Sequence, residues 1–171
     1  EAQKKIEELG RGAAWHFIGH LQSNKAKAAV RLFDWVHSVD SFRLAQELSR
    51  VAGQQNKVLP VLLQINLGQE TTKFGALQDD TFRLLEQMGL LPGISVKGLM
   101  TLPPFFDNPE ESRPYFHALR DLAEAVSRRK IAGVSMEELS MGMSNDFETA
   151  IEEGATLVRV GTAIFGPRPL K

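Results

Sequence analysis

Short apolar runs alternate with amphipathic stretches along the 171 residues of the chain. The apolar runs, rich in β-branched, aromatic and aliphatic residues, predict strands at residues 15–21, 35–39, 58–67, 96–102, 139–143 and 157–165. The amphipathic stretches predict helices at residues 24–32, 41–52, 79–88, 109–129 and 146–153. This alternation is typical of parallel strands joined by helical crossovers, and it predicts a single α/β domain over residues 1–171.

The start of the chain bears on the choice of α/β fold. Residues 1–10 predict the last turns of an amphipathic helix that ends at Gly10. Because a domain rarely begins within a helix, we expect this domain to be N-terminally incomplete. An open doubly wound sheet would need a glycine-rich turn after its first strand, where this sequence has residues 20–24, His-Leu-Gln-Ser-Asn. We therefore favour a (β/α)8 TIM-type barrel represented by about six βα units, with an open α/β phosphate- or nucleotide-binding protein as the alternative.

Composition excludes several classes of protein. The chain carries 20 basic and 21 acidic residues, so it has no basic surplus with which to bind nucleic acid. It has no cysteine, which excludes disulfides, thiolate metal sites and a cysteine nucleophile. The longest apolar runs are too short to cross a bilayer, and no signal peptide is visible. We expect a cytoplasmic monomer with neither nucleic acid nor membrane as a partner.

The segment after residue 143 is a candidate anion site. A predicted strand runs into Met143 and a helix is expected from about Asp146, so free backbone N–H groups and the Ser144 hydroxyl would meet at one point. The alternative is that Ser144 and Asn145 are ordinary helix caps, with Asn145 and Glu148 forming a capping box. The Asp146 carboxylate counts against an anion.

The last predicted strand carries an arginine among apolar residues. Val158 and Val160 share one face, and Arg159 shares the other with Gly161. If the valines face outer helices, Arg159 points into the barrel, where Gly161 and Thr162 would complete one anion pocket with Ser144. The alternative is a salt bridge between Arg159 and a structural carboxylate.

Two further groups of polar residues are ambiguous. His16 and His20 have an even spacing that would place both on one strand face, but no convincing third metal ligand follows, so we expect no metal site. Hydrogen-bonded core histidines, or a wall beside an aromatic ligand, fit them better. Gln64 and Asn66 are expected on the inner face of the central strand, as site residues or as buried structural amides. Lys73 is expected in an exposed loop.

Five segments together resemble the pyridoxal phosphate homeostasis proteins, also called the proline-synthetase co-transcribed family. They are residues 15–25 (WHFIGHLQSNK), 64–66 with Lys73 and Gly75, 98–100, 139–144 (LSMGMS) and 158–166 (VRVGTAIFG). The likeness covers nearly the whole chain. It implies an alanine-racemase-like (β/α)8 barrel that binds pyridoxal 5′-phosphate (PLP), with a role in vitamin B6 and amino-acid homeostasis as a cofactor carrier or regulator without strong catalysis.

The resemblance also implies site residues. Ser144, Gly161 and Thr162 should hold the phosphate, Arg159 should face the pyridine nitrogen, and Met143 and His16 should line the cofactor. The family's Schiff-base lysine lies in a motif like A-V-S-K on the first strand, followed by a motif like E-N-Y, and neither motif is in this sequence. We therefore assign no covalent lysine and no catalytic residue. The enzyme alternative is a PLP-dependent amino-acid racemase, which would need a second acid/base group; the one tyrosine, Tyr115, lies in a predicted helix.

Overall fold

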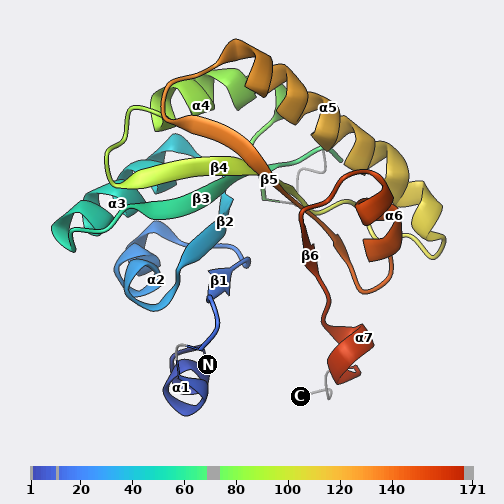
Figure 1. Ribbon diagram of the computed structural model, residues 1–171, viewed down its shortest axis with the longest axis horizontal. Coiled ribbons are helices and arrows are strands. Elements are labelled where there is room, and N and C mark those ends of the chain that lie inside the picture. Colours follow the sequence, from blue (N-terminus) through green and yellow to red (C-terminus); the bar gives the residue numbers. More distant parts are fainter. Residues whose placement is uncertain (1, 11, 69–73, 168–171) are drawn as a thin grey trace.

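Six parallel strands form one curved sheet in the order β1-β2-β3-β4-β5-β6 in the computed structural model, which describes residues 2–10, 12–68 and 74–167. The strands are β1 (His16–Phe17), β2 (Trp35–Val39), β3 (Leu59–Ile65), β4 (Ile94–Thr101), β5 (Val134–Met143) and β6 (Leu157–Arg159). Figure 1 shows that the sheet bends into a half-barrel. Because every crossover moves one strand onward in the same direction, this is barrel winding, and the doubly wound alternative is wrong.

Helices cover the convex face of the sheet, between consecutive strands (Figure 1). The α-helices are α1 (Ala2–Leu9), α2 (Ala26–Leu32), α3 (Phe42–Gln54), α4 (Thr81–Met88), α5 (Arg113–Arg129), α6 (Phe147–Glu152) and α7 (Thr162–Phe165). Single 3-10 turns, η1 (Ser23–Lys25), η2 (Gln78–Asp80) and η3 (Pro109–Ser112), precede α2, α4 and α5. As predicted, the first helix ends at Gly10, whose φ is +70° and whose N–H donates to the Ile6 carbonyl.

Strand alternation divides the molecule into an apolar outer core and a more polar interior. On β3, Val61, Leu63 and Ile65 join the core that the helices cover, whereas Leu62 and Gln64 lie on the opposite face, although both are buried. The outer core packs strands against helices through fully buried side chains, including Leu48, Leu63, Leu85, Leu99 and Leu119. The inner face is therefore free to carry the polar side chains of a binding site.

Three predicted strands differ from the observed ones by four or more residues at one end. The predicted strand at residues 157–165 is wrong beyond Arg159, because the backbone turns at Gly161 (φ −121°, ψ −78°) and continues as α7. The first strand is only His16–Phe17, so His20 lies in the following loop. By contrast β5 begins at Val134, five residues earlier than expected, because its first half carries the acidic residues Glu137 and Glu138 and gives no apolar run.

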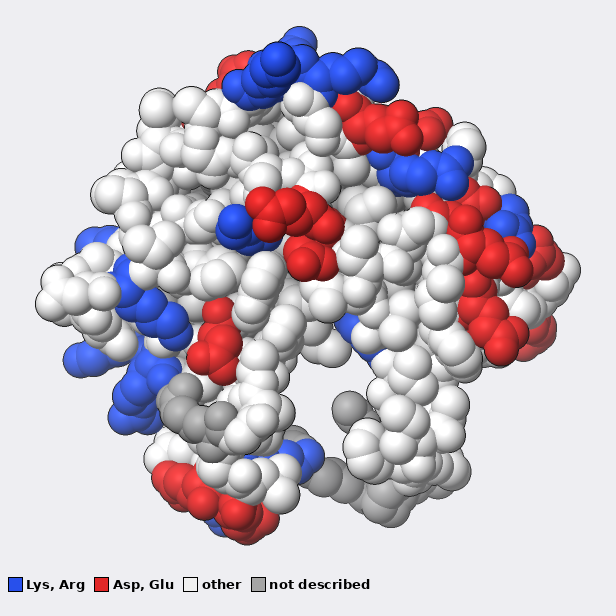
Figure 2. All heavy atoms as spheres, in the orientation of Figure 1, with Lys and Arg blue, Asp and Glu red and all other residues white. Residues whose placement is uncertain are grey.

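Charged side chains of both signs are interspersed on the face shown in Figure 2, and no single sign dominates it. None of the described helices has both the length and the apolarity that crossing a bilayer requires.

Candidate functional site

The guanidinium of Arg159 lies on the inner face of the half-barrel, as strand alternation predicts. Its Nη1 donates to Ser140 Oγ on β5 at 2.7 Å, and its Nη2 donates to the carbonyl oxygen of Thr101 at the end of β4 at 2.8 Å. Thr101 Oγ1 in turn donates to the Ile65 carbonyl on β3. The preceding residue, Val158, is 38% exposed. The arginine reaches across two strands to neutral acceptors.

Arg159 forms no ion pair with a carboxylate within the described ranges, so the alternative of a structural salt bridge finds no support there. Burial lowers the pKa of Arg159 to about 10, and the more distant Asp146 partly opposes this shift. The side chain therefore stays protonated near neutral pH. Burying a guanidinium among neutral acceptors is costly, and a ligand lone pair or anion would offset that cost.

A chain of hydrogen bonds continues from Arg159 to the far edge of the sheet. His37 Nδ1 lies 2.9 Å from Ser140 Oγ, and His37 Nε2 lies 2.8 Å from His16 Nδ1 on β1. The His16 ring stacks on Trp35, with centroids 5.5 Å apart and planes inclined by 6°. His16, which the family resemblance places beside the cofactor, is thereby connected to Arg159 through two residues that sequence reasoning did not assign, Ser140 and His37.

The two histidines of this hydrogen-bond network, His16 and His37, are held neutral. Burial, followed by the nearby His16 and Arg159, lowers the pKa of His37 to about 3. Burial also lowers the pKa of His16, although the carboxylates of Asp34 and Glu138 act in the opposite direction. At neutral pH each ring therefore has one N–H donor and one acceptor nitrogen.

Ser144 joins the loop after β5 to the turn after β6. Its Oγ accepts hydrogen bonds from the backbone N–H groups of Gly161 at 3.0 Å and Ala163 at 3.2 Å. The predicted juxtaposition of Ser144 with Gly161 and Thr162 is therefore present, but two amides there already bind the serine oxygen. Thr162 is exposed at the start of α7.

Asp146 shapes the loop after β5. The Asp146 carboxylate is buried, and its Oδ1 accepts from the Met143 N–H at 2.7 Å. Asn145 Nδ2 donates to the Phe106 carbonyl, and Asp146 occupies the N-cap position of α6, so the predicted capping box of Asn145 and Glu148 is wrong. Met143 is half-buried at the end of β5, beside this turn.

The remaining candidate residues lie elsewhere or are structural. Gln64 Nε2 donates to the Phe74 carbonyl at 2.9 Å and is a buried structural amide, while Asn66 donates its backbone N–H to the Ala76 carbonyl. Lys73 lies outside the described residues. Tyr115 belongs to α5, where its ring stacks on Phe106.

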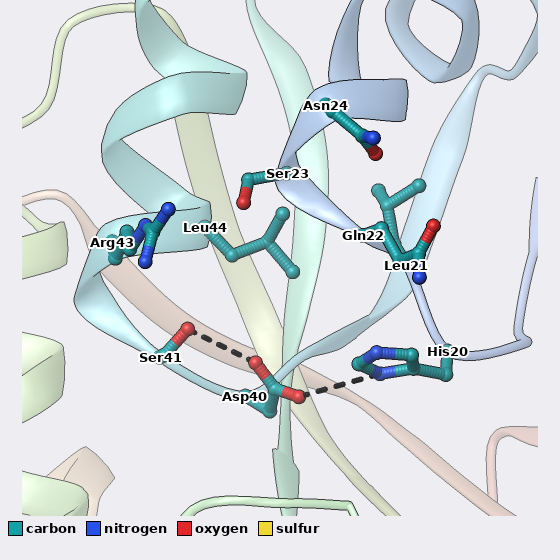
Figure 3. Close-up of a pocket in the computed structure, with 9 residues that line it drawn as sticks. All are labelled: His20, Leu21, Gln22, Ser23, Asn24, Asp40, Ser41, Arg43 and Leu44. Atoms are coloured by element: carbon teal, nitrogen blue, oxygen red, sulfur yellow. Dashed lines mark hydrogen bonds and ion pairs between the residues drawn. The ribbon is translucent and has the colours of Figure 1, made fainter.

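His20 lies apart from His16 and borders a cavity away from the inner face. This cavity, of about 490 Å³, lies between the loop after β1 and the start of α3 (Figure 3). His20 faces Asp40 there, with Nδ1 and Oδ2 3.8 Å apart, and Arg43 contributes a cation. The predicted sharing of one strand face by His16 and His20 is wrong, because β1 ends at Phe17. The described residues contain no cluster of three or more histidine, aspartate or glutamate side chains arranged for a metal ion.

The fold and this arrangement of residues define a barrel of the alanine racemase type. The family model for the alanine racemase N-terminal domain matches residues 1–169. Alanine racemase from Clostridium difficile 630 has the same fold, with a TM-score of 0.77 at 16% identity; the match covers all of this chain and 44% of that one.

Closer relatives place the chain within a subgroup. It is 47% identical over 169 residues to the pyridoxal phosphate homeostasis protein of Aquifex aeolicus (98% of this chain, 73% of that protein) and 40% identical over 167 residues to that of Escherichia coli K12 (96% and 70%). PipY of Synechococcus elongatus, whose structure was solved with PLP bound, gives a TM-score of 0.87 at 38% identity (96% and 77%). The chain belongs to the pyridoxal phosphate homeostasis protein family.

Proposed function

We propose that this chain binds pyridoxal 5′-phosphate on the inner face of the half-barrel and serves as a carrier of the cofactor in PLP homeostasis. The observation that carries the proposal is Arg159, a half-buried cation whose described partners are the neutral acceptors Ser140 and Thr101. A pyridine nitrogen supplies a lone pair for one of the remaining guanidinium N–H groups.

The donor set also suits a phosphate ester. Ser144 keeps its hydroxyl proton to donate, because its oxygen is the acceptor in both contacts with the turn after β6. Thr162, which has a hydroxyl and a backbone N–H, lies in the same turn and is an exposed residue. We propose that Ser144, Gly161 and Thr162 hold the phosphate, and that Met143 and His16 contact the rest of the cofactor.

Arg159 suits a carrier better than an aminotransferase. PLP supplies an aldehyde and an electron-accepting ring. A protonated arginine donates to the ring nitrogen and so keeps that nitrogen unprotonated, which makes the ring a weaker electron acceptor. The racemase alternative is disfavoured on a different ground: it needs a second acid/base group, and Tyr115 lies in α5, stacked on Phe106.

The test is a fluorescence titration of the chain with PLP. Arg159→Gln removes one charge-assisted hydrogen bond, worth about 1.5–3 kcal/mol, so affinity should fall about 10- to 100-fold. Thr162→Glu places an anion beside the phosphate and should also weaken binding. Arg83→Gln, an exposed arginine on α4 paired with Asp80, is the control and should bind like the parent. Equal affinities for all four proteins would overturn the proposal. We also propose a cytoplasmic monomer, which fractionation and sedimentation would test.

A further inference from the structure

The hydroxyl of Ser140 has one proton and two polar neighbours, and this fixes the direction of the hydrogen-bond chain. Ser140 is fully buried, with a relative exposure of 0%. Arg159 Nη1, at 2.7 Å, is a donor only, so the proton of Ser140 cannot point to it. The other neighbour is His37 Nδ1 at 2.9 Å. If His37 donated from Nδ1 instead, the buried serine proton would have no acceptor within the described part of the chain.

The donor-to-acceptor direction at Ser140 also determines which ring nitrogen carries the proton in His37 and in His16. With Nδ1 accepting from Ser140, neutral His37 carries its proton on Nε2 and donates it to His16 Nδ1 at 2.8 Å. His16 Nδ1 is then an acceptor, so neutral His16 carries its own proton on Nε2. Stacking on Trp35 fixes the plane of this ring.

We propose that His37 is a positioning residue, which together with Ser140 holds His16 in the Nε2–H tautomer, so that the inner face presents a neutral ring N–H on β1 as well as the guanidinium on β6. The site would then select a ligand with two separate hydrogen-bond acceptors, such as a nitrogen heterocycle carrying oxygen substituents. The use of the His16 proton toward PLP rests on the proposed function, whereas the position of the proton does not.

The same geometry opposes protonation of His16. A second proton on His16 would sit on Nδ1 and face the N–H of His37. Both hydrogen bonds of His37 would then have to reverse direction, and the hydroxyl proton of Ser140 would lose its acceptor. The charged and titratable groups around His16 are His37, Asp34 and Glu138, of which only the two carboxylates favour the imidazolium. Arg159, beyond Ser140, opposes positive charge on His37.

Long-range proton–nitrogen NMR of the nitrogen-15-labelled chain near pH 7.5 tests the proposal, because protonated and bare imidazole nitrogens resonate at different shifts. His16→Gln and His37→Gln variants assign the signals. We expect both His16 and His37 as neutral Nε2–H tautomers. An Nδ1–H tautomer at either residue, or a charged His16, would overturn the proposal without any ligand being added.

A matched pair of serine variants tests the origin of the tautomer. Ser140→Ala removes the proton donor and should shift the His37 and His16 nitrogen signals toward a mixture of tautomers. Ser38→Ala, which removes a buried hydroxyl of β2 with no hydrogen-bond partner among the described residues, should leave them unchanged. Unchanged tautomers in a folded Ser140→Ala protein would refute the role of Ser140; if that variant does not fold, the parent spectrum decides alone. Intact tautomers in a chain that does not bind PLP would instead refute the proposed function.

Discussion

The oxygen of Ser144 accepts the backbone N–H of Gly161 at 3.0 Å, so the loop after β5 and the turn after β6 are held together by a single side chain. A second bond, from Ala163, fixes the first turn of α7 to the same oxygen. The two loops expected to hold a phosphate are thus joined through the residue expected to donate to it.

Ser144→Ala should therefore weaken PLP binding about tenfold, because it removes a donor to the phosphate, worth about 1.4 kcal/mol, and releases the turn after β6. Affinity for pyridoxal, which lacks the phosphate, should change little. The measurement is a parallel titration with both ligands, and Ser127→Ala on the exposed side of α5 is the control. An equal loss for pyridoxal would place Ser144 away from the phosphate.

The packing of β4 against β5 gives a second prediction. A Cβ at Gly98 would collide with the carbonyl oxygen of Glu138 on the neighbouring strand, whereas a Cβ at Gly53 in α3 meets nothing within 4 Å. Gly98→Ala should lower the free energy of unfolding by about 3 kcal/mol through overpacking. Gly53→Ala should raise it by about 0.5 kcal/mol, because Gly53 lies in the last turn of α3 and alanine favours helical backbone over glycine. Urea denaturation measures both, and similar stabilities for the two variants would contradict the close approach of the strands.

The sequence predicted the fold because the apolar periodicity is strong. Strand alternation placed Arg159 and Gln64 on the inner face, and the structure agrees on both. The six parallel strands and the barrel-type winding also follow from the order of strands and helices. These features depend on burial patterns that are local in the sequence.

The errors fall where tertiary contacts decide the local structure. The run of residues 157–165 is mostly apolar, which predicts a continuous strand. Ser144, 17 residues before Gly161, instead binds the amides of Gly161 and Ala163, and the chain becomes helical there. The Asp146 carboxylate accepts the Met143 N–H, and Asp146 is the N-cap residue of α6, so the expected capping box of Asn145 and Glu148 does not form. The sequence analysis missed His37. The one feature of the sequence that could have indicated it is its position two residues after Trp35 on the same predicted strand, which puts both side chains on one face.

His37 should make stability depend on pH. Its pKa is near 6.5 in the unfolded chain and about 3 in the folded chain, so the unfolded chain binds the proton more tightly. The stability that neutral His37 confers is complete above pH 6.5 and is lost as the pH falls from 6.5 toward 3. Between pH 7 and 5 the loss should be about 2 kcal/mol. The free energy of unfolding of His37→Gln should fall less steeply over this interval, which lies above the pH range where most carboxylates titrate. Urea denaturation of parent and variant at several pH values measures this. Equal slopes for the two proteins would contradict the prediction.

Covalent attachment of PLP gives a further prediction for the 171-residue chain. Lys57 Nζ donates to the carbonyl oxygens of Val30 and Phe33, and Lys97 pairs with Glu137, so both amines have structural partners. We expect reversible binding and, after borohydride reduction and digestion, scattered labelling below one equivalent. A single lysine labelled stoichiometrically would show that this chain has its own covalent anchor.

The protonation state of the bound pyridine nitrogen tests the central claim most directly. Nitrogen-15-labelled PLP, bound to the chain near neutral pH, reports by NMR whether its ring nitrogen is bare or protonated. With Arg159 as the donor, the ring nitrogen should be unprotonated and hydrogen-bonded, and this signal should change in Arg159→Gln. A pyridinium signal in the parent protein, or the same signal in both proteins, would contradict the placement of Arg159 at the ring nitrogen.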